Sequence, residues 1–203
     1  MTRIKICGIC REEDTVYINE AKPDYFGMII DFPKSHRNLS PVQAEKIRSL
    51  VEKDIPAVGV FVNDDPKKIE ELLNKKVIDI AQLHGNESDE QILQIKENTG
   101  KPVWKAFKVR TKEDAEKAMA SPADLILLDN GYGTGECFDW KLIENVNRKF
   151  ALAGGIDCEN IRKAIKEVNP YLIDLSSGVE TDKKKDLEKI KAAVKAAHEF
   201  ERR

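Results

Sequence analysis

Short apolar segments alternate with longer amphipathic segments along the whole chain of 203 residues. Eight of the apolar segments have the length and the β-branched composition of buried strands. They span residues 3–7, 25–30, 57–62, 77–83, 103–107, 125–129, 150–153 and 172–176. The pattern therefore predicts an α/β protein in which strands and helices take turns.

Helix start signals lie between these predicted strands. Ser40 and Asp65 each stand directly before a proline, Ser88 precedes an apolar-periodic run, and Asp157 precedes the segment CENIRKAIKEV. Such residues at the first position satisfy the free N–H groups of a helix. A last amphipathic helix is predicted over residues 187–200, with its apolar residues on one face.

Eight successive strand–helix units predict a closed (β/α)₈ TIM barrel. An open doubly wound sheet is the alternative, but its first turn normally carries three glycines for a dinucleotide, and KICGICREED carries one. No linker or low-complexity tract divides the chain. We therefore expect a single barrel domain over residues 1–203.

Charge and hydropathy exclude two classes of partner. Lys and Arg number 34 against 36 Asp and Glu, and the lysine clusters lie among acids without interleaved aromatics, so nucleic-acid binding is not expected. The longest apolar run covers residues 57–62, whereas a membrane helix needs about 20 residues. The charged start MTRIKICGIC does not fit a secretion signal, so we expect a cytoplasmic protein.

The four cysteines raise a redox or zinc alternative. Cys7 and Cys10 form a C-x-x-C pair, but Cys137 and Cys158 do not supply the second compact pair that a structural zinc site needs. We therefore expect reduced thiols and no bound metal.

Unusual polar residues follow the predicted strands at their carboxyl ends, where the active site of such a barrel lies. They are Cys7, Arg37, Asn63, His84 and Asp129. This arrangement favours an enzyme, although each residue alone also fits a structural role. Arginine matches a carboxylate with two parallel hydrogen bonds, which makes Arg37 a candidate for binding one.

Glycine-rich loops follow in the second half: GYGTG at 131–135, AGGI at 153–156 and SSGVE at 176–180. Glycine lets backbone N–H groups approach an anion closely, and a phosphate site after strands seven and eight recurs in barrels. The candidate phosphate-binding residues are therefore Gly154, Gly155, Ser176, Ser177 and Gly178.

Six segments together resemble the phosphoribosylanthranilate isomerase family of tryptophan biosynthesis. They are KICGIC at 5–10, VGVFVN at 58–63, QLHGNE at 82–87, LLDNGYGTGECFDW at 127–140, LAGGI at 152–156 and DLSSGVE at 174–180. The resemblance covers essentially the whole chain. It departs at Cys10, where the family more often has threonine, and in the short stretch between Asp129 and GYGTG.

The resemblance implies a (β/α)₈ barrel without a cofactor, whose partner is a small phosphorylated ribosylamine. The reaction is an Amadori rearrangement, which needs an acid for the ring oxygen and a base for the proton on sugar C2. By resemblance Cys7 is the base and Asp129 the acid. Arg37 would bind the anthranilate carboxylate, and His84 would contact substrate or brace the barrel rim. A monomer and a homodimer are both left open.

Two other functions compete with this one. An isomerase of histidine biosynthesis performs the same rearrangement on a larger substrate with two phosphates, but that family uses carboxylates for both roles. A catalytically silent phosphate-binding barrel would keep the glycine loops and would have no need of Cys7 and Asp129.

Overall fold

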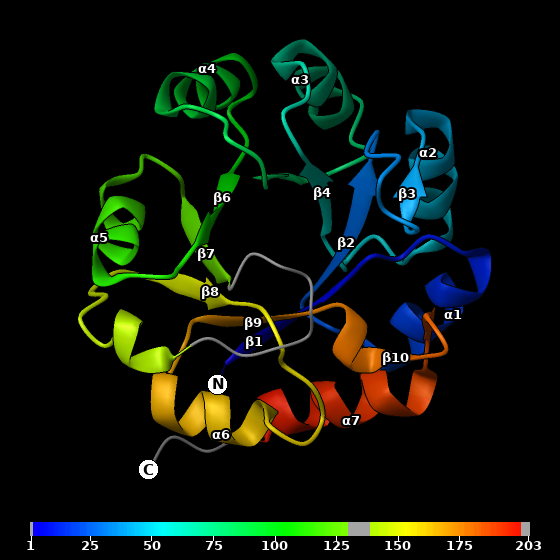
Figure 1. Ribbon diagram of the computed structural model, residues 1–203. Coiled ribbons are helices and arrows are strands. Elements are labelled where there is room, and N and C mark those ends of the chain that lie inside the picture. Colours follow the sequence, from blue (N-terminus) through cyan, green and yellow to red (C-terminus); the bar gives the residue numbers. More distant parts are fainter. Residues whose placement is uncertain (1, 130–138, 200–203) are drawn as a thin grey trace.

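A barrel of eight parallel strands forms the centre of the protein (Figure 1). The structure is a computed structural model that describes residues 2–129 and 139–199. The barrel strands are β1 (Arg3–Cys7), β2 (Tyr25–Ile30), β4 (Ala57–Phe61), β5 (Ile80–Leu83), β6 (Val103–Lys108), β7 (Leu125–Asp129), β8 (Phe150–Leu152) and β9 (Leu172–Leu175). Strand β1 pairs with both β2 and β9, which closes the sheet and confirms the predicted (β/α)₈ fold.

Helices surround the strands in a ring (Figure 1). They are α1 (Glu12–Ala21), α2 (Pro41–Leu50), α3 (Pro66–Asn74), α4 (Asp89–Thr99), α5 (Lys112–Ala120), α6 (Ile161–Val168) and α7 (Leu187–His198). Between β7 and β8 the described residues contain one short 3₁₀ helix, η1 (Trp140–Ile143), in place of a full helix. Four short elements lie within the loops: β3 (Asn38–Leu39), η2 (Ser177–Val179), β10 (Glu180–Thr181) and β11 (Lys184–Lys185).

Three of the four predicted helix starts are confirmed by their caps. The side chains of Ser40, Asp65 and Ser88 accept hydrogen bonds from backbone N–H groups in the first turns of α2, α3 and α4. The fourth is displaced, because the Asp157 side chain caps a separate turn by accepting from the N–H groups of residues 159 and 160. Helix α6 then begins at Ile161.

One predicted strand begins later than its apolar run. Val77 and Ile78 are buried, but their N–H groups donate to the carbonyl of Leu72 and so close the end of α3. Strand β5 starts at Ile80. Val77 and Ile78 are apolar because they are buried, although they make no strand hydrogen bonds, and the hydrophobic pattern therefore predicted a longer strand than β5.

Alternate strand residues fill two separate apolar layers. One cluster lies between strands and helices and includes Ile4 and Ile6 of β1, while the other fills the barrel interior and includes Leu125 and Leu127 of β7. Because side chains alternate along a strand, the interior rows continue to Cys7 on β1 and to Asp129 on β7. Both side chains therefore end at the carboxyl mouth of the barrel. Over the two described stretches, no helix has the length and apolar character to cross a membrane.

Candidate active site

A cavity of about 410 Å³ opens at the carboxyl ends of the strands. Eight of the nine predicted site residues line it, and the ninth, Gly178, lies in the loop immediately beside it. The eight are Cys7, Arg37, His84, Asp129, Gly154, Gly155, Ser176 and Ser177. Residues from both halves of the sequence thus meet in one cavity.

Cys7 ends β1 with 7% of its surface exposed, facing the cavity. Burial raises the pKa of its thiol, and the positive charge of Lys5 on the same strand acts in the opposite direction. The Ser176 hydroxyl donates to the Cys7 carbonyl over 3.2 Å, which ties the end of β1 to the loop after β9. Cys7 is therefore fixed in place, and burial alone would hold it as a thiol at neutral pH.

Asp129 ends β7 and lies near His84 from the end of β5. His84 Nε2 is 3.5 Å from Asp129 Oδ2, and the other ring nitrogen, Nδ1, is 3.3 Å from Gln82 Nε2. Gln82 is buried, and its Oε1 has no hydrogen-bond partner among the described residues. The Gln82 and His84 side chains thus lie in a row that ends at the Asp129 carboxylate.

The guanidinium group of Arg37 is held by Glu180 from the far end of the chain. Arg37 donates from Nε to Oε1 and from Nη2 to Oε2, each over 2.7 Å. Lys185 joins them, donating to Glu180 Oε1 over 2.7 Å and to the Ser176 carbonyl over 2.9 Å. Although burial alone would raise it, the hydrogen bonds and charges of Arg37 and Lys185 lower the pKa of Glu180 to about 2.

Gly8 makes this arrangement possible. A β-carbon on Gly8 would lie 2.3 Å from the Arg37 side chain and 3.2 Å from the Ser176 hydroxyl, and the backbone φ there is +82°. Only glycine suits both the space and the left-handed conformation. The turn after β1 therefore leaves room for Arg37 to cross toward Glu180.

The loops after β8 and β9 lie against each other. A β-carbon on Gly178 would come 2.0 Å from the Ile156 carbonyl and 2.9 Å from the Asp157 backbone, so no other residue fits without moving the loop. Gly154, Gly155, Ser176 and Ser177 line the cavity on this side. The two loops predicted to bind phosphate thus form one continuous wall of the cavity.

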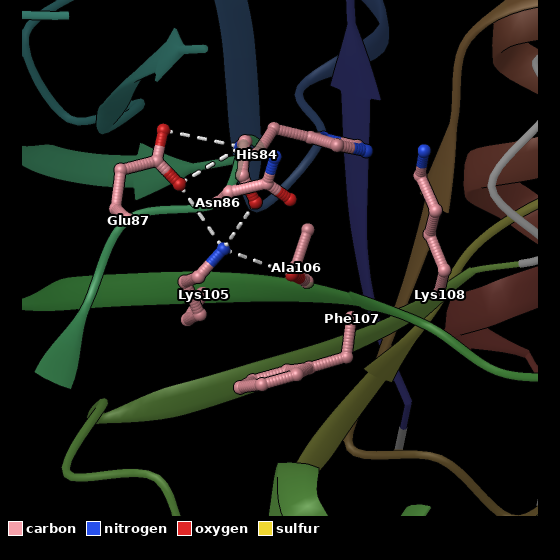
Figure 2. A pocket seen from close by; sticks show the side chains of 8 residues that line it. His84, Asn86, Glu87, Lys105, Ala106, Phe107 and Lys108 are labelled. Carbon is pink, nitrogen blue, oxygen red and sulfur yellow. Dashed lines mark hydrogen bonds and ion pairs between the residues drawn. The ribbon is translucent and has the colours of Figure 1, made fainter. Parts of the chain in front are cut away.

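A second pocket, of about 370 Å³, lies between the loop after β5 and the second half of β6 (Figure 2). Lys105 points into it toward Glu87, at 3.1 Å, and also donates to the Gly85 carbonyl over 2.8 Å. The Glu87 carboxylate accepts from the N–H groups of Asn63 and Gly85. This buried ion pair therefore clamps β6 to the loops after β4 and β5 and braces the segment that carries His84.

Other candidates from the sequence lie elsewhere. The GYGTG loop and Cys137 fall outside the described residues. Cys10 is a free thiol in the turn before α1, and Cys7 and Cys158 are free as well. His36 is exposed, and His198 is partly buried and lies 2.9 Å from Asp24.

Sequence reasoning missed four residues of the site: Lys5, Gln82, Glu180 and Lys185. Lys5 and Gln82 offered a signal, since each is a polar residue flanked by apolar residues in a predicted strand. Glu180 ends the SSGVE loop and Lys185 lies in the charged segment after it, and neither side chain by itself differs from an ordinary solvated charge.

Comparisons of sequence place the whole barrel in one family. The family model described as N-(5'phosphoribosyl)anthranilate (PRA) isomerase matches residues 4–196. The N-(5'-phosphoribosyl)anthranilate isomerase of Endomicrobium trichonymphae is 44% identical over 200 residues, covering 96% of this chain and 98% of the relative. The protein of that name from Clostridium acetobutylicum is 40% identical over 209 residues, covering 98% and 100%.

Solved structures agree with the sequences. The phosphoribosyl anthranilate isomerase of Thermotoga maritima superposes with a TM-score of 0.86 at 38% identity, covering 98% of this chain and 100% of that one. A structure of the isomerase with reduced 1-(o-carboxyphenylamino)-1-deoxyribulose 5-phosphate gives the same values. With the sequence match running from β1 into α7, the chain belongs to the N-(5'-phosphoribosyl)anthranilate isomerase family, the isomerases of tryptophan biosynthesis.

Proposed function

We propose that the cavity converts N-(5-phosphoribosyl)anthranilate to 1-(o-carboxyphenylamino)-1-deoxyribulose 5-phosphate, with Asp129 as general acid and Cys7 as general base. The observation that carries this proposal is that both side chains face one cavity whose wall is built from the two glycine loops. The cavity therefore offers a proton donor, a proton acceptor and an anion site together.

The chemistry requires two proton transfers. Asp129 protonates the furanose ring oxygen, so that the ring opens to a Schiff-base cation, and the Cys7 thiolate then takes the proton from sugar C2. The resulting enolamine rearranges to the ketose. The neighbouring His84 donates toward the Asp129 carboxylate once that group has lost its proton.

Two parts of the cavity bind the two charged groups of the substrate. The loop backbone at Gly154, Gly155, Ser176 and Ser177 is suited to the phosphate, because backbone N–H groups can converge on an anion there. Arg37 is suited to the anthranilate carboxylate, because Glu180 already holds its guanidinium group in one orientation. The relative solved with a phosphorylated product analogue supports this class of ligand.

The test compares Cys7→Ser, Asp129→Asn and the matched control Cys10→Ser, following the loss of substrate fluorescence. General acid–base groups contribute about 10²- to 10⁴-fold, so we expect each of the first two variants to lose kcat by that factor with KM little changed. Cys10→Ser should retain nearly full activity. If Cys7→Ser or Asp129→Asn keeps most of its kcat, the corresponding role is wrong.

The silent-barrel alternative makes the opposite prediction, since such a protein would bind phosphate without consuming substrate.

For assembly, a monomer and a homodimer remain the two expectations; the Thermotoga maritima relative is described as dimeric, with monomers generated from it. Sedimentation at several protein concentrations would distinguish the two states.

A further inference from the structure

A fully buried lysine lies inside the barrel directly beneath the cavity. Lys5 has 0% exposure and donates from Nζ to both carboxylate oxygens of Asp174, each over 2.9 Å. The two residues face each other across the β1–β9 pairing. Replacing such a pair by apolar residues is often neutral or stabilising, so stability alone does not explain it.

Lys5 and Cys7 are neighbours in space as well as in sequence. They lie two residues apart on β1, and so on the same face of the strand. A point beside Gly27, where its β-carbon would be, lies 2.8 Å from Cys7 Sγ and 2.9 Å from Lys5 Cε. The absence of a side chain at Gly27 leaves these two groups in direct reach of each other.

The charges that face Cys7 come from four elements. Lys5 on β1, Lys185 on β11 and Arg37 after β2 are positive, and Asp174 on β9 is negative. Glu180 balances one of the positive charges through its contacts with Arg37 and Lys185. With three cations against two anions, the group carries one positive charge, which a thiolate at Cys7 would neutralise.

We propose that Lys5 is a positioning residue whose buried ammonium group, oriented by Asp174, stabilises the thiolate of Cys7. This inference rests on the proposed function, in which Cys7 acts as the base. Lys5 keeps its proton throughout: the thiolate takes the proton from substrate C2 and becomes a thiol, and no bond to Lys5 forms or breaks. Burial by itself would hold Cys7 as an inactive thiol, and the ammonium group counteracts that effect.

The experiment measures the pH dependence of Cys7 alkylation by iodoacetamide, quantified by mass spectrometry of the Cys7 peptide. An opposite charge at close range favours the ionised form by about 1 to 3 pH units. In Lys5→Met we therefore expect the alkylation midpoint to move up by at least about one unit, which lowers the rate at pH 8 about tenfold. The limb of the pH profile on which kcat increases with pH follows ionisation of the base, and its midpoint should move up by the same amount.

Two further variants make the outcome decisive. Lys5→Met/Asp174→Asn leaves no unpaired carboxylate, and the midpoint should still rise, because Lys5 acts on Cys7 more strongly than Asp174 does. This double variant decides the matter if the single one does not fold. Lys105→Met is the matched control: it also breaks a buried ion pair, but on the outer face of β6, and should leave the Cys7 midpoint unchanged.

The inference is overturned if a folded Lys5 variant shows the parental alkylation midpoint, or if Lys105→Met shifts it equally. Its failure is distinguishable from failure of the proposed function. If Cys7→Ser abolishes turnover while Lys5→Met leaves the midpoint unmoved, the base assignment stands and Lys5 is structural. If the midpoint moves but Cys7→Ser keeps its kcat, Lys5 still controls the thiol and Cys7 is not the base.

Discussion

Arg37 and Glu180 form a two-point ion pair in which both contacts measure 2.7 Å, although 143 residues separate them in the chain. The pair joins the loop after β2 to the start of β10, over the end of β1, which lies between β2 and β9. Glu180 thereby fixes the plane of the guanidinium group before any ligand arrives. The carboxylate ligand proposed for Arg37 would then meet an arginine that is already ordered.

Weakening this pair should affect binding more than turnover. In Glu180→Gln the amide keeps the shape but loses the charge, so Arg37 is oriented less firmly and KM should rise about tenfold with kcat little changed. Arg37→Ala should raise KM further. Steady-state kinetics on both variants check this, and an unchanged KM in Arg37→Ala would make Arg37 a structural residue.

The same carboxylate should contribute to stability in a pH-dependent way. The pKa of Glu180 falls from 4.5 to about 2 on folding, so its contribution is fully present above pH 4.5 and is lost as the pH falls toward 2. The free energy of unfolding should therefore differ most between the parent and Glu180→Gln at neutral pH. Urea unfolding at several pH values measures this difference; one that grows toward pH 2 would contradict the assignment.

Gly178→Ala tests the contact between the two glycine loops. The added methyl group would meet the Ile156 carbonyl, so the loops must separate and the proposed anion site would lose its shape. We expect inhibition by inorganic phosphate to weaken about tenfold or more, as a loss of two or so hydrogen bonds implies. Gly100→Ala is the control: its position at the end of α4 is open, and phosphate inhibition should not change.

Lys105→Met tests the clamp formed with Glu87. Removing one partner of a buried ion pair leaves the other uncompensated and costs about 3–5 kcal/mol of unfolding free energy. Lys75→Met removes an exposed pair with Glu71 on α3 and should produce no measurable change. Chemical denaturation of the three proteins decides the matter; equal stability of the two variants would show that the clamp is dispensable.

The sequence was informative wherever a single residue carried the signal. Cys7, His84 and Asp129 each interrupt an apolar run where a strand ends, and the barrel brings such ends together, so their shared cavity could be predicted without coordinates. Ser40 and Ser88 could be recognised as helix caps for a similar reason: the cap and its partner are only three residues apart.

Pairwise relationships over long distances could not be found in this way. Glu180 resembles any surface acid until Arg37 is placed beside it, and Glu87 resembles a loop residue until Lys105 reaches it from β6. Asp157 was misread for a different reason. The residue does cap a turn, but that turn closes on Ile161, the first residue of α6, and local sequence does not distinguish a short turn from the start of a helix.

The closure of the barrel by β1 and β9 has a consequence for synthesis. Strand β1 leaves the ribosome before the other barrel strands, yet one of its two hydrogen-bonding neighbours is made more than 160 residues later. Until then one edge of the nascent sheet stays unpaired, and such an edge is prone to wrong association. Because Cys7 and Ser176 sit at the two sides of this seam, the cavity stays open on that side until β9 has been made.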